Sequence, residues 1–83
     1  MHAVEAFPTV VGDDCVIGHI VHLEGCVIHD RALVGSGSVV LHHAHVRSGA
    51  TVAAGAVVRN RMDVPEGALA VGVPAQILSL IHI

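Results

Sequence analysis

The sequence has 83 residues, a formal net charge of −3 and only four lysines and arginines in total. This charge balance argues against a surface that binds nucleic acid or an anionic membrane. Hydrophobic residues make up 53% of the chain, but glycine, aspartate or histidine interrupts them every few positions, so no segment predicts a membrane span. No signal peptide is evident, and we expect one domain over residues 1–83 in a cytoplasmic protein.

Residues 1–8 are predicted to form a loop that ends at Phe7-Pro8. A six-residue repeat follows in residues 9–64. A branched aliphatic residue marks each repeat, and a small or compact residue stands two positions before it. The aliphatic positions are Val11, Ile17, Leu23, Ile28, Val34, Val40, Val46, Val52 and Val58. The positions before them are Thr9, Cys15, Val21, Cys26, Ala32, Ser38, Ala44, Ala50 and Ala56.

A period of six fits neither an α-helix nor a simple strand, but it is typical of a parallel β-helix. Each repeat then gives one short strand and one corner, and three repeats close a coil that stacks about 4.8 Å above the previous one. The sequence therefore predicts an all-β fold of about three coils, with the aliphatic and small residues pointing inward. The one five-residue step, from Leu23 to Ile28, predicts a corner that is shorter by one residue.

Both cysteines occupy inward positions of the repeat, so Cys15 and Cys26 are predicted to be buried free thiols rather than a disulfide. Residues 65–83 are predicted to form an exit segment and a short C-terminal extension. Within it, residues 68–75 read as extended chain. Residues 76–80 could start a helix, although one too short to be stable alone.

Several short motifs resemble the γ-class carbonic anhydrase family. They are Ile17-Gly18-His19, Gly25-Cys26, Ala32-Leu33-Val34-Gly35, Val39-Val40, residues 53–58 and Gly72-Val73-Pro74-Ala75. The resemblance implies a left-handed β-helix that assembles as a homotrimer, with a catalytic metal at each subunit interface. It also implies reversible hydration of CO2 to bicarbonate. The family's earlier coils and C-terminal helix have no counterpart here, which indicates a fragment of a longer protein.

The same resemblance implies the metal ligands, which in the family are three histidines. Two of those positions hold His2 and His19, whereas the third, directly before Gly25-Cys26, holds Glu24. Zn²⁺ accepts this mixed donor set, and Fe²⁺ or Co²⁺ are alternatives. A carboxylate ligand lowers the positive charge at the metal, so slower CO2 hydration is expected. The resemblance further implies that Glu5 transfers the proton.

Other interpretations of the chain stay open at this stage. The repeat also occurs in acyltransferases, in which a histidine acts as general base on the acceptor while CoA lies between prisms. A non-catalytic trimeric scaffold with a vestigial site is a third alternative. Among the remaining histidines, His22 is expected to point outward, and a role beside the metal ligands or at the subunit interface is the less favoured alternative. His42, His43 and His45 are expected to be surface residues rather than a second metal site.

Overall fold

The computed structural model of the protein describes residues 8–80, and every regular element in that range is a β-strand. Most of the strands are only two residues long, because each repeat reaches its next corner after one inward and one outward side chain. They are β1 (Val10–Val11), β2 (Val16–Ile17), β3 (His22–Leu23), β4 (Val27–Ile28), β5 (Leu33–Val34), β6 (Val39–Val40), β7 (His45–Val46), β8 (Thr51–Val52), β9 (Val57–Val58), β10 (Asp63–Val64), β11 (Ala68–Val71) and β12 (Gln76–Leu80).

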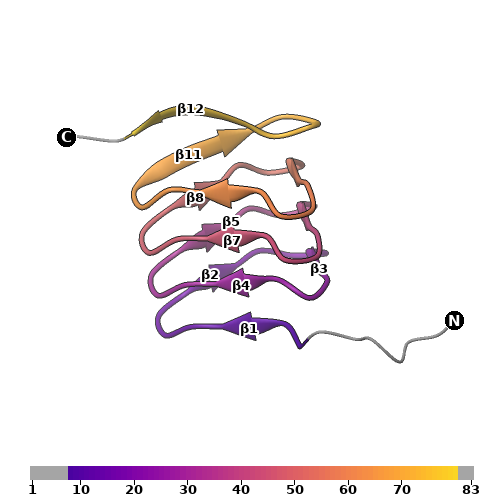
Figure 1. Ribbon diagram of the computed structural model, residues 1–83, viewed down its shortest axis with the longest axis vertical. Helices are drawn as coiled ribbons and strands as arrows, with labels where there is room; N and C mark the ends of the chain where they lie inside the picture. The colour runs from indigo at the N-terminus through magenta and orange to yellow at the C-terminus, as the bar shows by residue number, and fades with distance from the viewer. Residues whose placement is uncertain (1–7, 81–83) are drawn as a thin grey trace, which may run out of the picture.

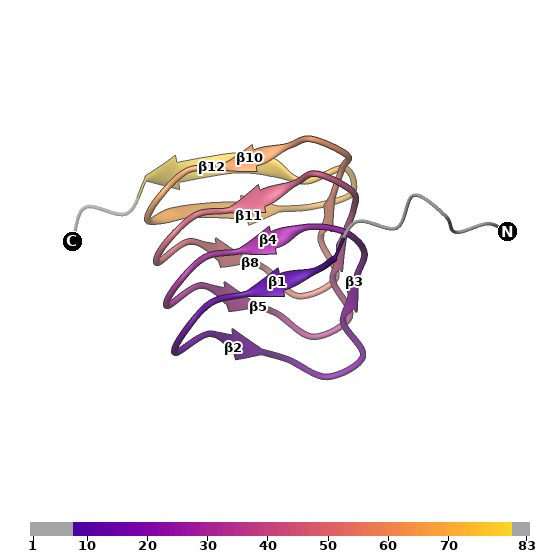
Figure 2. The same ribbon diagram turned by 60° about the horizontal axis from the view of Figure 1, so that its bottom comes forward.

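Each strand of the solenoid pairs in parallel with the strand three positions later, so the chain winds into stacked coils (Figure 1). Three sheets result. Sheet A has the order β1-β4-β7-β10, sheet B the order β12-β11-β8-β5-β2, and sheet C the order β3-β6-β9. The three sheets form the three sides of a prism, and Figure 2 shows β1, β2 and β3 on different sides. The prediction of an all-β parallel solenoid of about three coils is confirmed.

The core of the prism is the predicted ladder of aliphatic and small residues. Val40 and Val52 are each 0% exposed, and the small residues Ala44, Ala50 and Ala56 are equally buried. The only buried polar side chain in the described range is Ser38, whose hydroxyl donates a hydrogen bond of 2.9 Å to the Ala53 carbonyl. Because the inward side chains are short, they fit inside coils that stack at the spacing of hydrogen-bonded strands in a β-sheet.

The shortened corner lies where the sequence predicts it. Val10 pairs with Val27, whereas Val27 pairs with His45, so the first coil is one residue shorter than the second. Gly25 takes up the tight corner with a φ of 63°, a left-handed conformation that glycine adopts without steric cost. The aliphatic residues of this first coil form the open end of the prism. Val11 and Ile17, which were predicted to be buried in the core, are exposed, because no described strand pairs with β1 or β2 on that side.

The C-terminal part differs from the sequence-based expectation. Strand β11 continues sheet B in parallel with β8, and the chain then turns back so that β12 pairs antiparallel with β11. Residues 76–80, where a helix could have started, are therefore a strand. A five-residue helix has too few hydrogen bonds to be stable, whereas the free edge of β11 offers partners for the backbone of this segment. Within residues 8–80 no helix is long and apolar enough to cross a membrane.

Candidate metal site

His19 lies at the corner between β2 and β3, where two coils approach closely. A Cβ atom on Gly18 would lie only 2.6 Å from the Ser36 backbone nitrogen, so this position requires glycine. The backbone N–H of His19 donates a hydrogen bond of 3.0 Å to the Ser36 hydroxyl. The corner is therefore held against the next coil, and the imidazole of His19 stays exposed to solvent.

Glu24 lies at the next corner, between β3 and β4. Its backbone N–H donates to the Val40 carbonyl at 3.0 Å, and the N–H of Gly25 donates to the Thr9 hydroxyl at 2.9 Å. These bonds fix the corner from the coils on both sides. The Glu24 side chain is 48% exposed, so its carboxylate is accessible from outside the prism.

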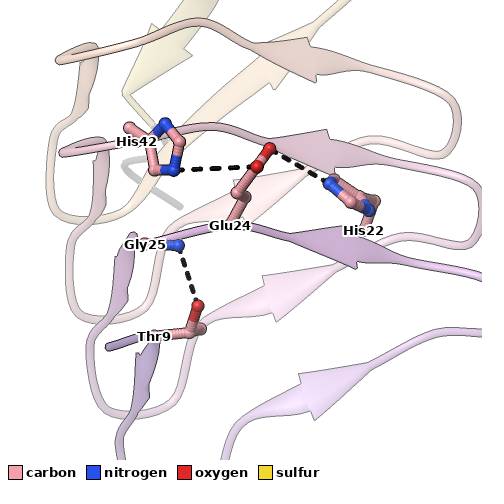
Figure 3. A network of polar contacts seen from close by, with 5 residues as sticks. All are labelled: Thr9, His22, Glu24, Gly25 and His42. Atoms are coloured by element: carbon pink, nitrogen blue, oxygen red, sulfur yellow. Dashed lines mark hydrogen bonds and ion pairs between the residues drawn. The ribbon is translucent and has the colours of Figure 1, made fainter. Parts of the chain in front are cut away.

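The Glu24 carboxylate lies between two imidazoles (Figure 3). Its Oε1 atom is 3.2 Å from Nε2 of His22, and its Oε2 atom is 3.7 Å from Nε2 of His42. His22 belongs to the same coil, and His42 comes from the following coil. The outward orientation predicted for His22 is confirmed by its exposure. The sequence did not predict the contact of His42 with Glu24, which joins corner residues of neighbouring coils just beyond the pairing of Leu23 with Val40.

The buried Cys26 thiol lies directly behind this corner. Burial raises the pKa of Cys26, and backbone hydrogen bonds in the Glu24–Cys26 segment oppose the rise only in part. The thiol is therefore protonated at neutral pH, and it lies inside the prism with no exposed surface. Cys15 and Cys26 are both free, as predicted, although Cys15 is only partly buried.

The structure separates the two described candidate ligands, because His19 and Glu24 occupy different corners of one prism. Among residues 8–80, no group of three or more His, Cys, Asp or Glu side chains lies close enough to hold a metal ion. The other two predicted site residues, His2 and Glu5, lie outside the described residues. Imidazole and carboxylate are donors that Zn²⁺ accepts, and both side chains are exposed, so each is accessible to a metal ion from outside the prism.

A second polar cluster lies on the outer face of sheet A and was not predicted from the sequence. Nε2 of His29 is 3.0 Å from Nδ1 of His45 and 3.3 Å from a terminal nitrogen of Arg47. Arg47 also donates a hydrogen bond of 2.7 Å to the Asp63 carboxylate. Because a guanidinium can only donate, Nε2 of His29 is the acceptor in its contact with Arg47, and Nδ1–H of His45 is then the donor between the two imidazoles.

Burial lowers the pKa of His45 most, the neighbouring Arg47 and His29 lower it further, and Asp63 has a smaller opposing effect. His45 was expected to be a plain surface residue, but it is only partly exposed and has a defined partner. The signal that could have revealed the cluster is the coil length. It places position 45 beside positions 27 and 63, and position 29 beside position 47.

The sequence of the chain matches the model of a known protein family. Residues 8–42 and 25–60 match the model of the family described as bacterial transferase hexapeptide (six repeats). Together with the stacked parallel coils, this match shows that the chain belongs to the hexapeptide-repeat family.

Within this class, carbonic anhydrases are among the similar proteins. A probable carbonic anhydrase of Methanocaldococcus jannaschii is 41% identical over 78 residues, which cover 94% of this chain and 49% of that protein. Gamma carbonic anhydrase 1, mitochondrial, of Arabidopsis thaliana is 39% identical over 71 residues, which cover 86% of this chain and 26% of that protein. The chain thus spans about half or less of the length of these curated relatives.

Solved structures of transferases share the fold as well. A hexapeptide transferase family protein from Anaplasma phagocytophilum superposes with a TM-score of 0.79 at 32% identity, over 89% of this chain and 49% of that one. PerB from Caulobacter crescentus, solved with CoA and GDP-perosamine, gives a TM-score of 0.77 at 30% identity, over 86% of this chain and 34% of that one.

Proposed function

We propose that the chain is part of a γ-carbonic anhydrase-like protein that catalyses reversible hydration of CO2 to bicarbonate. The observation that carries this proposal is the placement of His19 and Glu24 as exposed donors on adjacent corners. The similarity to carbonic anhydrases over most of the chain supports the same activity. Since one prism separates the two donors, the proposal includes a cyclic homotrimer in which neighbouring subunits complete each site.

In the proposed site, His2, His19 and Glu24 would hold a Zn²⁺, Fe²⁺ or Co²⁺ ion. When bound, such an ion supplies hydroxide at neutral pH by acidifying water. The chain's own part is to bind the ion and to receive the proton, a role that we assign to Glu5. Glu24 adds a negative charge where a third histidine would be neutral. The charge helps to hold the metal ion, but it makes the bound water less acidic, so we expect slow hydration of CO2.

The contacts of Glu24 bear on how it would act as a ligand. Both carboxylate oxygens already have an imidazole neighbour, His22 on one side and His42 on the other. These neighbours limit the rotation of the carboxylate, which lowers the entropy lost on metal binding. His22 and His42 are therefore positioning residues in the proposed site.

Exposed apolar side chains beside His19 support the proposed trimer. Ile20 follows His19, is 92% exposed and has a φ of 54°, a conformation that is rare for a β-branched residue. Val16 and Leu33 are paired neighbours on the outer face of sheet B, and both are exposed. Apolar residues at these places suit contact with another subunit.

The proposal is tested by measuring the metal content, the molecular mass and the CO2 hydration rate of the purified protein. We expect a trimer with one zinc, iron or cobalt ion per chain, and hydration that a chelator abolishes. His19→Ala should lose the metal while keeping the fold. A folded wild-type protein without stoichiometric metal, even after incubation with Zn²⁺, would contradict the proposal.

Acyl transfer is the second candidate function, because transferases with solved structures share this fold at about 30% identity. The discriminating measurement is transfer from acetyl-CoA to amino or hydroxyl acceptors, with CoA binding followed in parallel. Saturable CoA binding without stoichiometric metal would favour acyl transfer. If the protein binds neither CoA nor metal, a scaffold role is favoured.

A further inference from the structure

A hollow of about 610 Å³ lies at the corner between β9 and β10, in the same stack of corners as Glu24. Its volume falls within the range of about 300–1,000 Å³ that is usual for small-molecule sites. The residues that line it are Leu41, Arg59, Asn60, Arg61 and Met62. No residue of the proposed CO2-hydrating site lines this hollow.

The hollow carries positive charge, and no described carboxylate forms an ion pair with its arginines. Arg59 and Arg61 are both exposed, and none of the ion pairs between side chains of residues 8–80 includes either of them. Half of the four arginines of the chain therefore lie in one hollow of a protein whose net charge is −3. Unpaired positive charge at this density attracts an anion.

The backbone of the corner is held by hydrogen bonds. The N–H of Arg61 donates to the His42 carbonyl of the preceding coil at 2.9 Å, and the N–H of Met62 donates to the Arg59 carbonyl at 3.1 Å. Arg61 has a φ of 63°, so it is the left-handed residue of the turn. The partly buried side chains of Leu41 and Met62 give the hollow an apolar part beside the two guanidinium groups.

We propose that this hollow binds a phosphate-bearing small molecule. The guanidinium groups of Arg59 and Arg61 contact the phosphate, and the organic part lies against Leu41 and Met62. A guanidinium matches the geometry of phosphate oxygens with paired hydrogen bonds. A phosphate monoester carries about −1.5 to −2 charges at neutral pH, which balances two guanidinium groups, whereas a single carboxylate balances only one. The site is independent of the proposed CO2 hydration.

Arg31 provides a matched control at another corner of the prism. It is the left-handed residue of the turn between β4 and β5, with a φ of 61°, and its N–H donates to the Asp13 carbonyl at 2.9 Å. The backbone of Arg31 therefore has the same left-handed conformation as that of Arg61, and the same hydrogen bond to the preceding coil. The carboxylate of Asp30, however, lies at this corner and accepts a hydrogen bond from the Asp13 N–H. A carboxylate here opposes the binding of an anion.

The test is a titration of isotope-labelled protein, followed through backbone amide shifts at constant ionic strength. The probes are adenosine 5′-monophosphate, inorganic phosphate and acetate. We expect saturable shifts centred on Asn60, Arg61 and Met62, with adenosine 5′-monophosphate binding several-fold more tightly than inorganic phosphate. Acetate should bind at least tenfold more weakly than phosphate.

The variants separate this site from general attraction of anions. Arg59→Gln combined with Arg61→Asn should weaken binding of adenosine 5′-monophosphate at least tenfold, while Arg31→Asn leaves it unchanged. Asparagine tolerates the left-handed turn position, and circular dichroism verifies that each variant is folded. Equal loss in Arg31→Asn, equal binding of acetate, or no saturable shift in the wild type would each overturn the proposal.

Discussion

Replacement of Val40 by alanine measures how much the inward ladder stabilises the solenoid. Val40 is 0% exposed and belongs to the middle strand of sheet C, with β3 on one side and β9 on the other. Val→Ala removes two methyl groups, which at about 0.8 kcal/mol each amounts to about 1.6 kcal/mol of transfer free energy. The cavity left between the coils adds to this, so we expect a loss of about 2–3 kcal/mol in the free energy of unfolding.

The assay is urea unfolding followed by circular dichroism, with Val39→Ala as the control. Val39 is the neighbouring residue on the same strand, but it points outward and is only partly buried. We expect the control to lose less than half as much stability as Val40→Ala. Equal losses in the two variants would refute the assignment of Val40 as inward and Val39 as outward. A soluble Val40→Asp protein that unfolds cooperatively would refute it as well, because an unpaired charge cannot be buried in this core.

Three further predictions follow from single side chains. Glu24→His should raise the CO2 hydration rate at matched metal content, because it removes a negative charge from the metal; an unchanged or lower rate would contradict this. Stability should fall as the pH drops below about 6.5, since the pKa of His45 is lowered in the folded state and the unfolded chain then binds more protons. His45→Gln should flatten that part of the pH profile, and an unaltered profile would refute the assignment. Gly18→Ala should lower the melting temperature clearly more than Gly37→Asn, because a Cβ on Gly18 meets the Ser36 backbone whereas Gly37 faces open space; similar losses would show that the contact at Gly18 is unimportant.

Much of the fold could be predicted because the repeat depends on local geometry. A branched aliphatic every six residues, with a small residue two positions earlier, determines which side chains point inward. The aliphatic positions of the repeat from Ile28 to Val58 are buried accordingly. The five-residue step predicted the tight corner at Gly25 for the same reason. Strand β12 could not be predicted in this way, because it depends on the free edge of β11 rather than on a pattern within residues 76–80.

The candidate site was predicted only as separate residues. Positions such as His19 and Glu24 could be assigned from short motifs, but their partners come from other coils. His42 contacts Glu24, and His45 contacts His29, only because the coil length brings distant positions together. Once that length is known, the neighbours of any outward position can be listed from the sequence. The hydrogen bonding and the pKa of a residue still depend on whether the neighbouring side chain is a carboxylate, an imidazole or a guanidinium.

The central claim is that His19 and Glu24 serve one metal ion from two different chains. It is tested most directly by complementation between His19→Ala and Glu24→Ala, each of which should bind no metal alone. In randomly mixed cyclic trimers, an intact Glu24 meets an intact His19 at roughly a quarter of all interfaces. We therefore predict that co-refolded variants recover about a quarter of the wild-type metal content. If the mixture binds no more metal than either variant alone, while the wild type binds one ion per chain, the shared site is contradicted.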